Sequence, residues 1–225
     1  MTFADNVAHI KATIKQAQES ASAHRELTLI CVSKYHTVEE AKAIYDLGIR
    51  DFAENYVQGL QEKQAALPDD ITWHLIGPLQ SRKVKDVINQ VDYFHALDRL
   101  KIAKEINKRA DHVIKCFVEV NVSGEESKHG IKPEEVMPFV QACAAYPKVE
   151  IIGLMTMAPH DAPDEEKRGI FRTLRELQQA IMEKRLPGAP CSELSMGMTS
   201  DYPLAVLEGA SFVRIGTAFF QSDDR

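Results

Sequence analysis

The sequence lacks the segments that would place a protein in or across a membrane. None of its apolar runs approaches the roughly 18 consecutive residues of a spanning helix. Residues 1–16 are amphipathic and mixed in charge, so they do not resemble a secretory signal. The formal net charge is −6, and no basic stripe occurs. We therefore expect neither membrane nor nucleic acid as a partner. With 44% hydrophobic residues, the chain is also unlike a disordered one.

Cysteine is scarce, and common metal and nucleophile motifs are missing. The four cysteines (Cys31, Cys116, Cys143, Cys191) form no CxxC pair, and we expect reduced thiols in a cytoplasmic protein. His74 and His95 end neighbouring apolar runs, but no HxH or HExxH spacing completes a metal site. We therefore interpret them as packing or hydrogen-bonding residues and predict no metal. No GxSxG or Walker motif appears either.

Short apolar runs alternate with segments of helical spacing along the whole chain. The predicted strands are Leu27–Ser33, Asp51–Glu54, Thr72–Ile76, Tyr93–Leu97, Val113–Val120, Glu150–Met155, Ser192–Ser195 and Phe212–Ile215. The helices between them are expected to begin near Thr37, Val57, Ser81, Asp98, Pro133, Asp164 and Thr199. Thr37 and Glu40 have the spacing of a capping box, and Pro133 suits a first helical turn.

Eight strand–helix units in one short chain favour a (β/α)8 TIM barrel, an α/β fold. A doubly wound sheet is the alternative, although the first strand is not followed by a GxGxxG turn. Residues Thr2–Ala23 predict an extra N-terminal helix that covers the face between the last strand and the first. No linker or repeat divides the chain, so one domain over residues 1–225 is predicted.

The C-terminal ends of the strands are where such barrels place their active sites. Lys34 follows the first strand, where apolar walls would favour its neutral amine. A free amine there could add to an aldehyde or ketone and form a Schiff base. An ordinary loop lysine is the alternative at this point.

Two glycine-containing loops after the last two strands predict a phosphate site. Ser195-Met-Gly-Met-Thr-Ser contains Gly197, and we expect Thr199 or Ser200 to cap the next helix. Arg214-Ile-Gly-Thr adds Gly216 and Thr217 as backbone and hydroxyl donors. Loops after strands seven and eight are the recurrent phosphate site of this fold. Tight turns alone would be the other explanation for these glycines.

Arg214 should lie at the mouth of the eighth strand. A guanidinium donates hydrogen bonds and accepts none. Opposite a pyridine nitrogen, it would keep that nitrogen unprotonated and weaken the ring as an electron sink. An ion pair with a nearby acid is the competing interpretation.

Eight segments together resemble the pyridoxal phosphate homeostasis protein family, which is related to the N-terminal barrel of alanine racemases. They are CVSKYHT, DFAENYVQGLQEK, WHLIGPLQSRK, YFHALDR, VEVNVSGEESKHG, GLMTMAP, ELSMGMTSDYPLAV and VRIGTAFF. The resemblance implies a barrel of fold type III that binds pyridoxal 5′-phosphate (PLP), with Lys34 as the Schiff-base lysine. It also implies phosphate contacts from Ser195, Gly197, Gly216 and Thr217, Arg214 at the pyridine nitrogen, and Asn55, His74 and Met155 lining the pocket.

Two positions depart from the family pattern. Ala53 stands where relatives often have glycine, and Arg82 stands where LQSNK forms have asparagine. Neither position bears on the expected Schiff base, although Arg82 changes the charge expected at the mouth of the pocket.

The resemblance implies a PLP carrier that acts in vitamin B6 homeostasis, with no catalytic residue, and with PLP-requiring apoenzymes as expected recipients. A PLP-dependent amino-acid racemase is the main alternative, and a cofactor-free Lys34 aldolase is a third. Racemases of this type carry a second domain, and two-base racemization needs a group on each substrate face. Of the two groups that racemization needs, the sequence assigns only Lys34 to the site. Without that second domain, a monomer is expected.

Overall fold

Eight parallel strands close into a barrel in the computed structural model, which describes residues 1–21, 25–126 and 129–222. Each strand pairs with the next, and β8 pairs with β1 through Thr28–Phe212 and three further positions. The strands are β1 (Thr28–Val32), β2 (Asp51–Glu54), β3 (Thr72–Leu75), β4 (Tyr93–Leu97), β5 (Ile114–Glu119), β6 (Val149–Met155), β7 (Glu193–Ser195) and β8 (Phe212–Ile215). The predicted (β/α)8 barrel is confirmed, and no doubly wound sheet forms.

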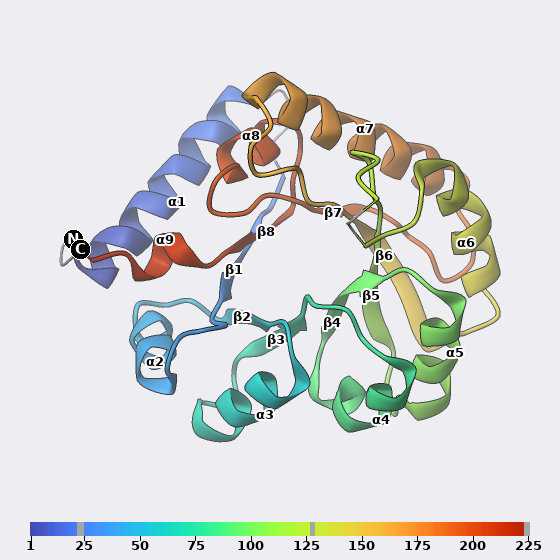
Figure 1. The fold of residues 1–225 in the computed structure, drawn as a ribbon, viewed down its shortest axis with the longest axis horizontal. Coiled ribbons are helices and arrows are strands. Elements are labelled where there is room, and N and C mark those ends of the chain that lie inside the picture. Colours follow the sequence, from blue (N-terminus) through green and yellow to red (C-terminus); the bar gives the residue numbers. More distant parts are fainter. Residues whose placement is uncertain (22–24, 127–128, 223–225) are drawn as a thin grey trace.

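Helices surround the barrel and bury their apolar faces against it (Figure 1). They are α2 (Val38–Asp46), α3 (Val57–Ala66), α4 (Val84–Val87), α5 (Leu100–Arg109), α6 (Val136–Cys143), α7 (Asp164–Glu183), α8 (Tyr202–Leu207) and α9 (Thr217–Phe220). The described residues also contain three 3₁₀ turns: Ser81–Lys83, Ile88–Gln90 and Pro133–Glu135. Pro133 opens its turn as expected, and the Thr37 hydroxyl accepts from the Glu40 N–H at 3.1 Å.

The N-terminal helix α1 (Phe3–Ser20) packs against α8, α9 and α2, where the ring of helices would otherwise be open (Figure 1). Its buried face includes Val7, Ile10, Ile14 and Ala17, as the spacing predicted. The Asn6 amide also donates to two backbone carbonyls near the end of the described chain, at 2.9 and 2.8 Å. The predicted covering role is confirmed. Residues 22 and 23 of the expected helix lie outside the described residues.

The last internal helix begins at Tyr202, so the expectation of a start near Thr199 with Thr199 or Ser200 as its cap is wrong. Pro203 lies in the first turn and Asp201 is the N-cap residue. The Asp201 carboxylate accepts from the Met198 N–H at 2.8 Å. Residues 198–201 therefore form a separate turn between β7 and α8.

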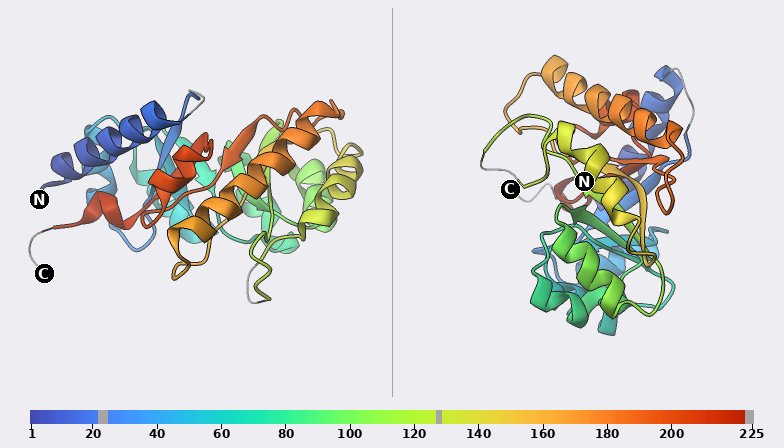
Figure 2. Two further views of the ribbon diagram at one scale, coloured as in Figure 1. Left: turned by 90° about the horizontal axis from the view of Figure 1, so that it is seen from above. Right: turned by 90° about the vertical axis from the view of Figure 1, so that its right-hand side faces the viewer.

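The barrel interior contains a cluster of apolar and aromatic side chains beside several buried polar ones. Phe117 and Phe212 pack edge to face at 5.0 Å and form part of this inner core. Ala53 is fully buried in the same core. Segments 121–126 and 158–163, which follow β5 and β6, extend on the same side of the barrel (Figure 2). None of the described helices combines the length and hydrophobicity needed to cross a bilayer.

Candidate functional site

A cavity of about 620 Å³ lies at the C-terminal ends of the strands. Six of the nine candidate residues line it: Lys34, Asn55, Met155, Arg214, Gly216 and Thr217. Because these residues lie at or just after the C-terminal ends of β1, β2, β6 and β8, only barrel closure brings them together. The remaining three, His74, Ser195 and Gly197, do not line the cavity.

Lys34 lies in the turn that follows β1, two residues beyond the end of the strand. Its side chain is half-buried, and its Nζ lies 5.5 Å from the centre of the Tyr35 ring. Tyr35 has a φ of +67° and is 87% exposed. A bulky residue rarely adopts this left-handed conformation, so the turn carries local backbone strain beside the lysine.

A buried ion pair holds the chain just before Lys34. The Lys63 ammonium lies 2.5 Å from a carboxylate oxygen of Glu54, and both side chains are almost fully buried. Lys63 also donates to the Ser33 carbonyl at 2.8 Å, and the Ser33 hydroxyl donates to Glu54 at 2.8 Å. These bonds fix the backbone from which Lys34 projects.

Arg214 on β8 is the buried cation of the site. Its guanidinium donates to the Ser195 hydroxyl and, at 3.2 Å, to the Thr156 carbonyl. Burial lowers the pKa of Arg214 to about 10, while the charges of Glu119 and Asp201 act in the opposite direction. The side chain therefore remains a cation at neutral pH and, although 4% exposed, it still reaches the cavity wall.

The loops after β7 and β8 meet at one side of the cavity. The Ala218 N–H donates to the Thr199 hydroxyl at 3.3 Å and so links the two loops. Among the described residues, the N–H groups of Thr199, Ser200, Gly216 and Thr217 make no hydrogen bond. Unpaired N–H groups beside a cavity can bind an anion.

Gly197 is required by the path of the first loop. Its φ is +104°, and a Cβ atom would lie 2.8 Å from the Ala205 side chain. Gly197 accepts a hydrogen bond from the Arg214 N–H through its carbonyl at 2.9 Å. It therefore joins the loop to β8 from outside the cavity.

Ser195 and His74 lie in the barrel interior below the cavity, and both are fully buried. The Ser195 hydroxyl is hydrogen-bonded to Arg214 and to His95. His74 lies between Asp51 and His95. Among the described residues, no cluster of three or more potential metal ligands occurs.

Glu119, at the end of β5, is a cavity residue that sequence reasoning missed. It is 4% exposed, and burial, with the charge of Asp98, raises its pKa to about 7. Asn121 and Ser123 follow Glu119 two and four residues further along the chain. Those side chains hydrogen-bond to each other and hold the following loop. An acidic residue inside the apolar run 113–120 was the available signal.

Asn55 is a second cavity residue with a distinctive feature, an unpaired side-chain oxygen. Its side-chain oxygen is buried and has no hydrogen-bond partner among the described residues. An unsatisfied buried acceptor costs roughly 1–3 kcal/mol, so a donor from a bound molecule would stabilise it. Arg82, by contrast, is exposed and donates to Gln80 at 3.0 Å, away from the cavity lining.

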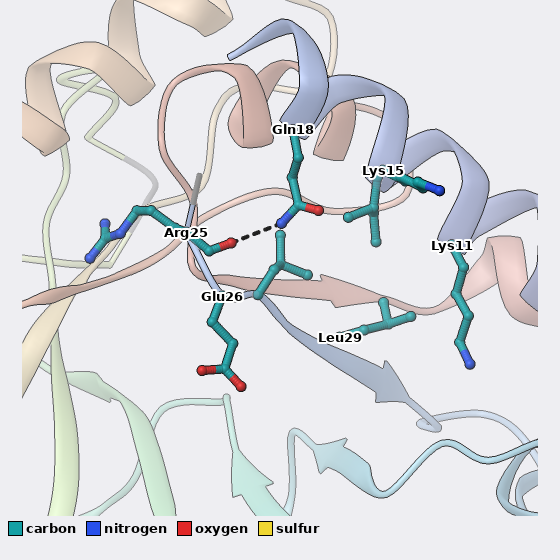
Figure 3. A pocket seen from close by; sticks show the side chains of 8 residues that line it. Lys11, Lys15, Gln18, Arg25, Glu26 and Leu29 are labelled. Atoms are coloured by element: carbon teal, nitrogen blue, oxygen red, sulfur yellow. Dashed lines mark hydrogen bonds between the residues drawn. The ribbon is translucent and has the colours of Figure 1, made fainter. Parts of the chain in front are cut away.

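A separate groove of about 530 Å³ lies between α1 and the beginning of β1 (Figure 3). Figure 3 shows Lys11, Lys15 and Gln18 on the helix, with the Gln18 amide donating to the Arg25 carbonyl at 2.9 Å. None of the candidate site residues lies there. The groove is thus distinct from the cavity that contains Lys34.

The chain is similar to characterised proteins over nearly its whole length. Residues 6–224 match the family model of the alanine racemase N-terminal domain. The pyridoxal phosphate homeostasis protein of Aquifex aeolicus is 37% identical over 98% of both chains. PipY of Synechococcus elongatus PCC7942, solved with PLP bound, is 31% identical, with a TM-score of 0.85 over 98% of this chain and 100% of that one.

A protein of unknown function from Bifidobacterium adolescentis is 33% identical and has a TM-score of 0.91, covering 97% of this chain and 94% of its own. The closed barrel, the cavity at its C-terminal side and these similarities agree. The chain belongs to the pyridoxal phosphate homeostasis protein family, whose barrel is the alanine racemase N-terminal domain.

Proposed function

We propose that this protein binds PLP and acts as an intracellular carrier in PLP homeostasis. The observation that carries the proposal is a single cavity that contains an amine, a buried guanidinium and a set of unpaired backbone N–H groups. PLP carries an aldehyde, a pyridine nitrogen and a phosphate, which are the three groups that such a cavity would recognise. The family relationship supports the same ligand.

Each side of the cavity suits one part of PLP. PLP supplies an aldehyde that reacts reversibly with primary amines. Lys34 would hold it as a Schiff base, since its amine is the cavity's nucleophile. Gly216 and Thr217 would bind the phosphate with their N–H groups. Apolar walls that include Val32 and Met155 would contact the ring.

The other candidates have indirect or weaker proposed roles. Ser195 and Gly197 belong to the phosphate loop, and the contacts of Ser195 with Arg214 support a role in holding the arginine. Asn55 would accept a hydrogen bond from the bound molecule through its unpartnered oxygen. His74 supports the site from inside the barrel.

Arg214 favours binding over catalysis. Because a guanidinium is only a donor, it would leave a facing pyridine nitrogen unprotonated. That nitrogen would then withdraw little charge from a substrate carbanion. We therefore propose a carrier with no catalytic residue, from which an incoming amine takes the group while the Lys34 amine leaves. PLP-requiring apoenzymes are the proposed recipients.

A PLP-dependent racemase is the second candidate, and Glu119 is the observation that favours it. A carboxyl group with a pKa of about 7 can donate and accept protons at neutral pH. β5 stands opposite β1 in an eight-stranded barrel, so Glu119 and Lys34 approach the cavity from opposite sides. Such a placement would supply the two groups that racemization needs.

We further propose a monomer in the cytoplasm. All four cysteines are buried free thiols, as expected for a reducing compartment.

A transfer experiment separates the two functions. PLP-loaded protein is mixed with a PLP-requiring apoenzyme and a scavenger of free PLP, and recovery of enzyme activity is followed. The carrier predicts recovery despite the scavenger, and no recovery from Lys34→Ala protein that has been incubated with PLP in the same way. Incubation with L-alanine or L-serine, followed by chiral chromatography, should yield no D-enantiomer. Sustained appearance of the D-enantiomer would establish the racemase instead.

A further inference from the structure

Five polar side chains form a continuous hydrogen-bonded row through the barrel interior. Asp51, at the start of β2, lies 2.9 Å from His74 Nε2. His74 Nδ1 lies 2.8 Å from His95 Nε2, and His95 Nδ1 lies 2.8 Å from the Ser195 hydroxyl. The Ser195 oxygen accepts from Arg214. The row thus links the N-terminal end of the barrel to the cavity at its other end.

The surroundings of the row keep both imidazoles neutral. His74 and His95 are fully buried, and burial is the largest cause that lowers the pKa of each. Tyr93 stacks on the His74 ring at 4.6 Å, and Phe117 stacks on the His95 ring at 4.4 Å. A neutral imidazole has one N–H donor and one acceptor nitrogen, so the direction of each bond is fixed by its neighbours.

Only one proton arrangement satisfies every group with Asp51 ionised. Its carboxylate accepts, so His74 carries its proton on Nε2 and accepts at Nδ1. His95 must then donate from Nε2 and accept at Nδ1. The Ser195 hydroxyl donates to that Nδ1, and its oxygen is left to accept from Arg214. Every bond therefore donates in the same direction, from the arginine towards Asp51.

The reversed arrangement leaves a group unsatisfied. Arg214 cannot accept, so the Ser195 oxygen would have to accept from both Arg214 and His95. The Ser195 proton would then have no acceptor in the row, and Asp51 would have to be protonated. A buried unpaired hydroxyl costs roughly 1–3 kcal/mol. The direction of the row is therefore set by its two ends.

We propose that Asp51, His74 and His95 are positioning residues for Arg214. They hold the Ser195 oxygen as an acceptor facing the guanidinium, and the Thr156 carbonyl binds another nitrogen of the same group. The remaining N–H groups of Arg214 are thereby directed at the cavity. In this row the Ser195 hydroxyl is hydrogen-bonded to His95 and Arg214. Ser195 therefore positions the arginine, and the backbone N–H groups of the neighbouring loops bind the phosphate. The effect on bound PLP rests on the function proposed above.

The row itself is tested in the protein without PLP, by long-range ¹H–¹⁵N NMR of the histidine rings at pH 7.5. We expect His74 and His95 to be neutral and protonated at Nε2. Asp51→Ala should leave His74 without this fixed tautomer and change the His95 signals, whereas Asp51→Asn, which keeps an oxygen acceptor, should restore the wild-type pattern. Asp69→Ala, at an exposed acid, is the matched control. A proton on Nδ1 of either ring in the wild type, or an unchanged pattern in Asp51→Ala, would overturn the proposal.

The consequence for the cavity is tested with PLP. Asp51→Ala should weaken PLP binding about tenfold, as expected for one hydrogen bond to a charged group, and Asp51→Asn should restore it. Ser195→Ala, a small change next to Arg214 in the row, should weaken PLP binding similarly. Unchanged affinity in both Asp51→Ala and Ser195→Ala would refute the positioning role. If the wild type bound no PLP, the proposed function would fail while the NMR result on the row still stood.

Discussion

The carboxylate of Glu54 lies 2.5 Å from the ammonium of Lys63, inside the protein and next to Ser33. Lys34 is the next residue, so this buried pair supports the turn from which the proposed PLP-binding amine projects. Removing one member of a buried pair leaves an uncompensated charge, which typically costs about 3–5 kcal/mol. The pair therefore couples the stability of the barrel to the placement of Lys34.

Lys63→Met should lower the free energy of unfolding by about 3–5 kcal/mol, measured by urea denaturation. The control is Lys42→Met, because Lys42 makes an ion pair of the same length with Asp46 on the surface. Exposed pairs contribute less than about 1 kcal/mol. Adding Glu54→Gln to Lys63→Met should recover much of the lost stability. Equal effects of the Lys63 and Lys42 variants would show that burial of the pair has no energetic role.

The two buried histidines predict loss of stability in acid. Their pKa values are lowered in the folded protein, so stability is full above the ordinary histidine value near 6.5 and is lost as the pH falls below it. Each contributes up to about 1.4 kcal/mol per pH unit in that range. The difference in unfolding free energy between wild type and His95→Gln should therefore shrink from pH 7.5 to pH 5.5. A constant difference would mean that His95 does not resist protonation.

Glu119 should act in the opposite direction. Its pKa is raised to about 7 from 4.5, so its contribution to stability is greatest below pH 4.5 and is lost as the pH rises through 7. Glu119→Gln should therefore gain stability relative to the wild type by about 2 kcal/mol between pH 5 and pH 8. Urea denaturation at the two pH values measures this change. Parallel pH profiles of wild type and variant would contradict the raised pKa.

Gly197 should tolerate no side chain. Gly197→Ala places a methyl group against Ala205 at a φ of +104°, and we expect a loss of about 2–3 kcal/mol. Ala205→Gly makes room for the methyl group without relieving the backbone strain. A double-mutant cycle should therefore give a favourable coupling energy but incomplete recovery. A coupling energy of zero would show that the two residues do not meet in solution.

The sequence predicted the barrel and the main cavity residues because both follow from periodicity along the chain. Alternating strands and helices define the closed sheet, and the C-terminal ends of the strands define the site. Lys34 and Arg214 were found in this way. Because β1 and β8 are neighbours in the closed barrel, the order of the strands alone predicts that Lys34 and Arg214 line the same cavity.

The interior residues could not be predicted in the same way. Asp51 and Glu119 belong to strands whose inward-facing positions depend on strand register, and the β5–β6 pairing shifts register between Cys116 and Phe117. The bonds of His74 and His95 join four strands, so no local spacing reveals them. The start of α8 was misplaced because residues 198–201 form a separate turn. Asp201, and not Thr199 or Ser200, is therefore the N-cap residue of the helix.

The attachment of PLP to Lys34 is tested most directly by borohydride reduction followed by peptide mass spectrometry. Protein saturated with PLP and then reduced should carry the added mass on the peptide that contains Lys34, at one group per chain. Lys34→Ala protein treated identically should carry none. An unmodified Lys34 peptide, or the same mass on another lysine such as Lys63 or Lys83, would contradict the account.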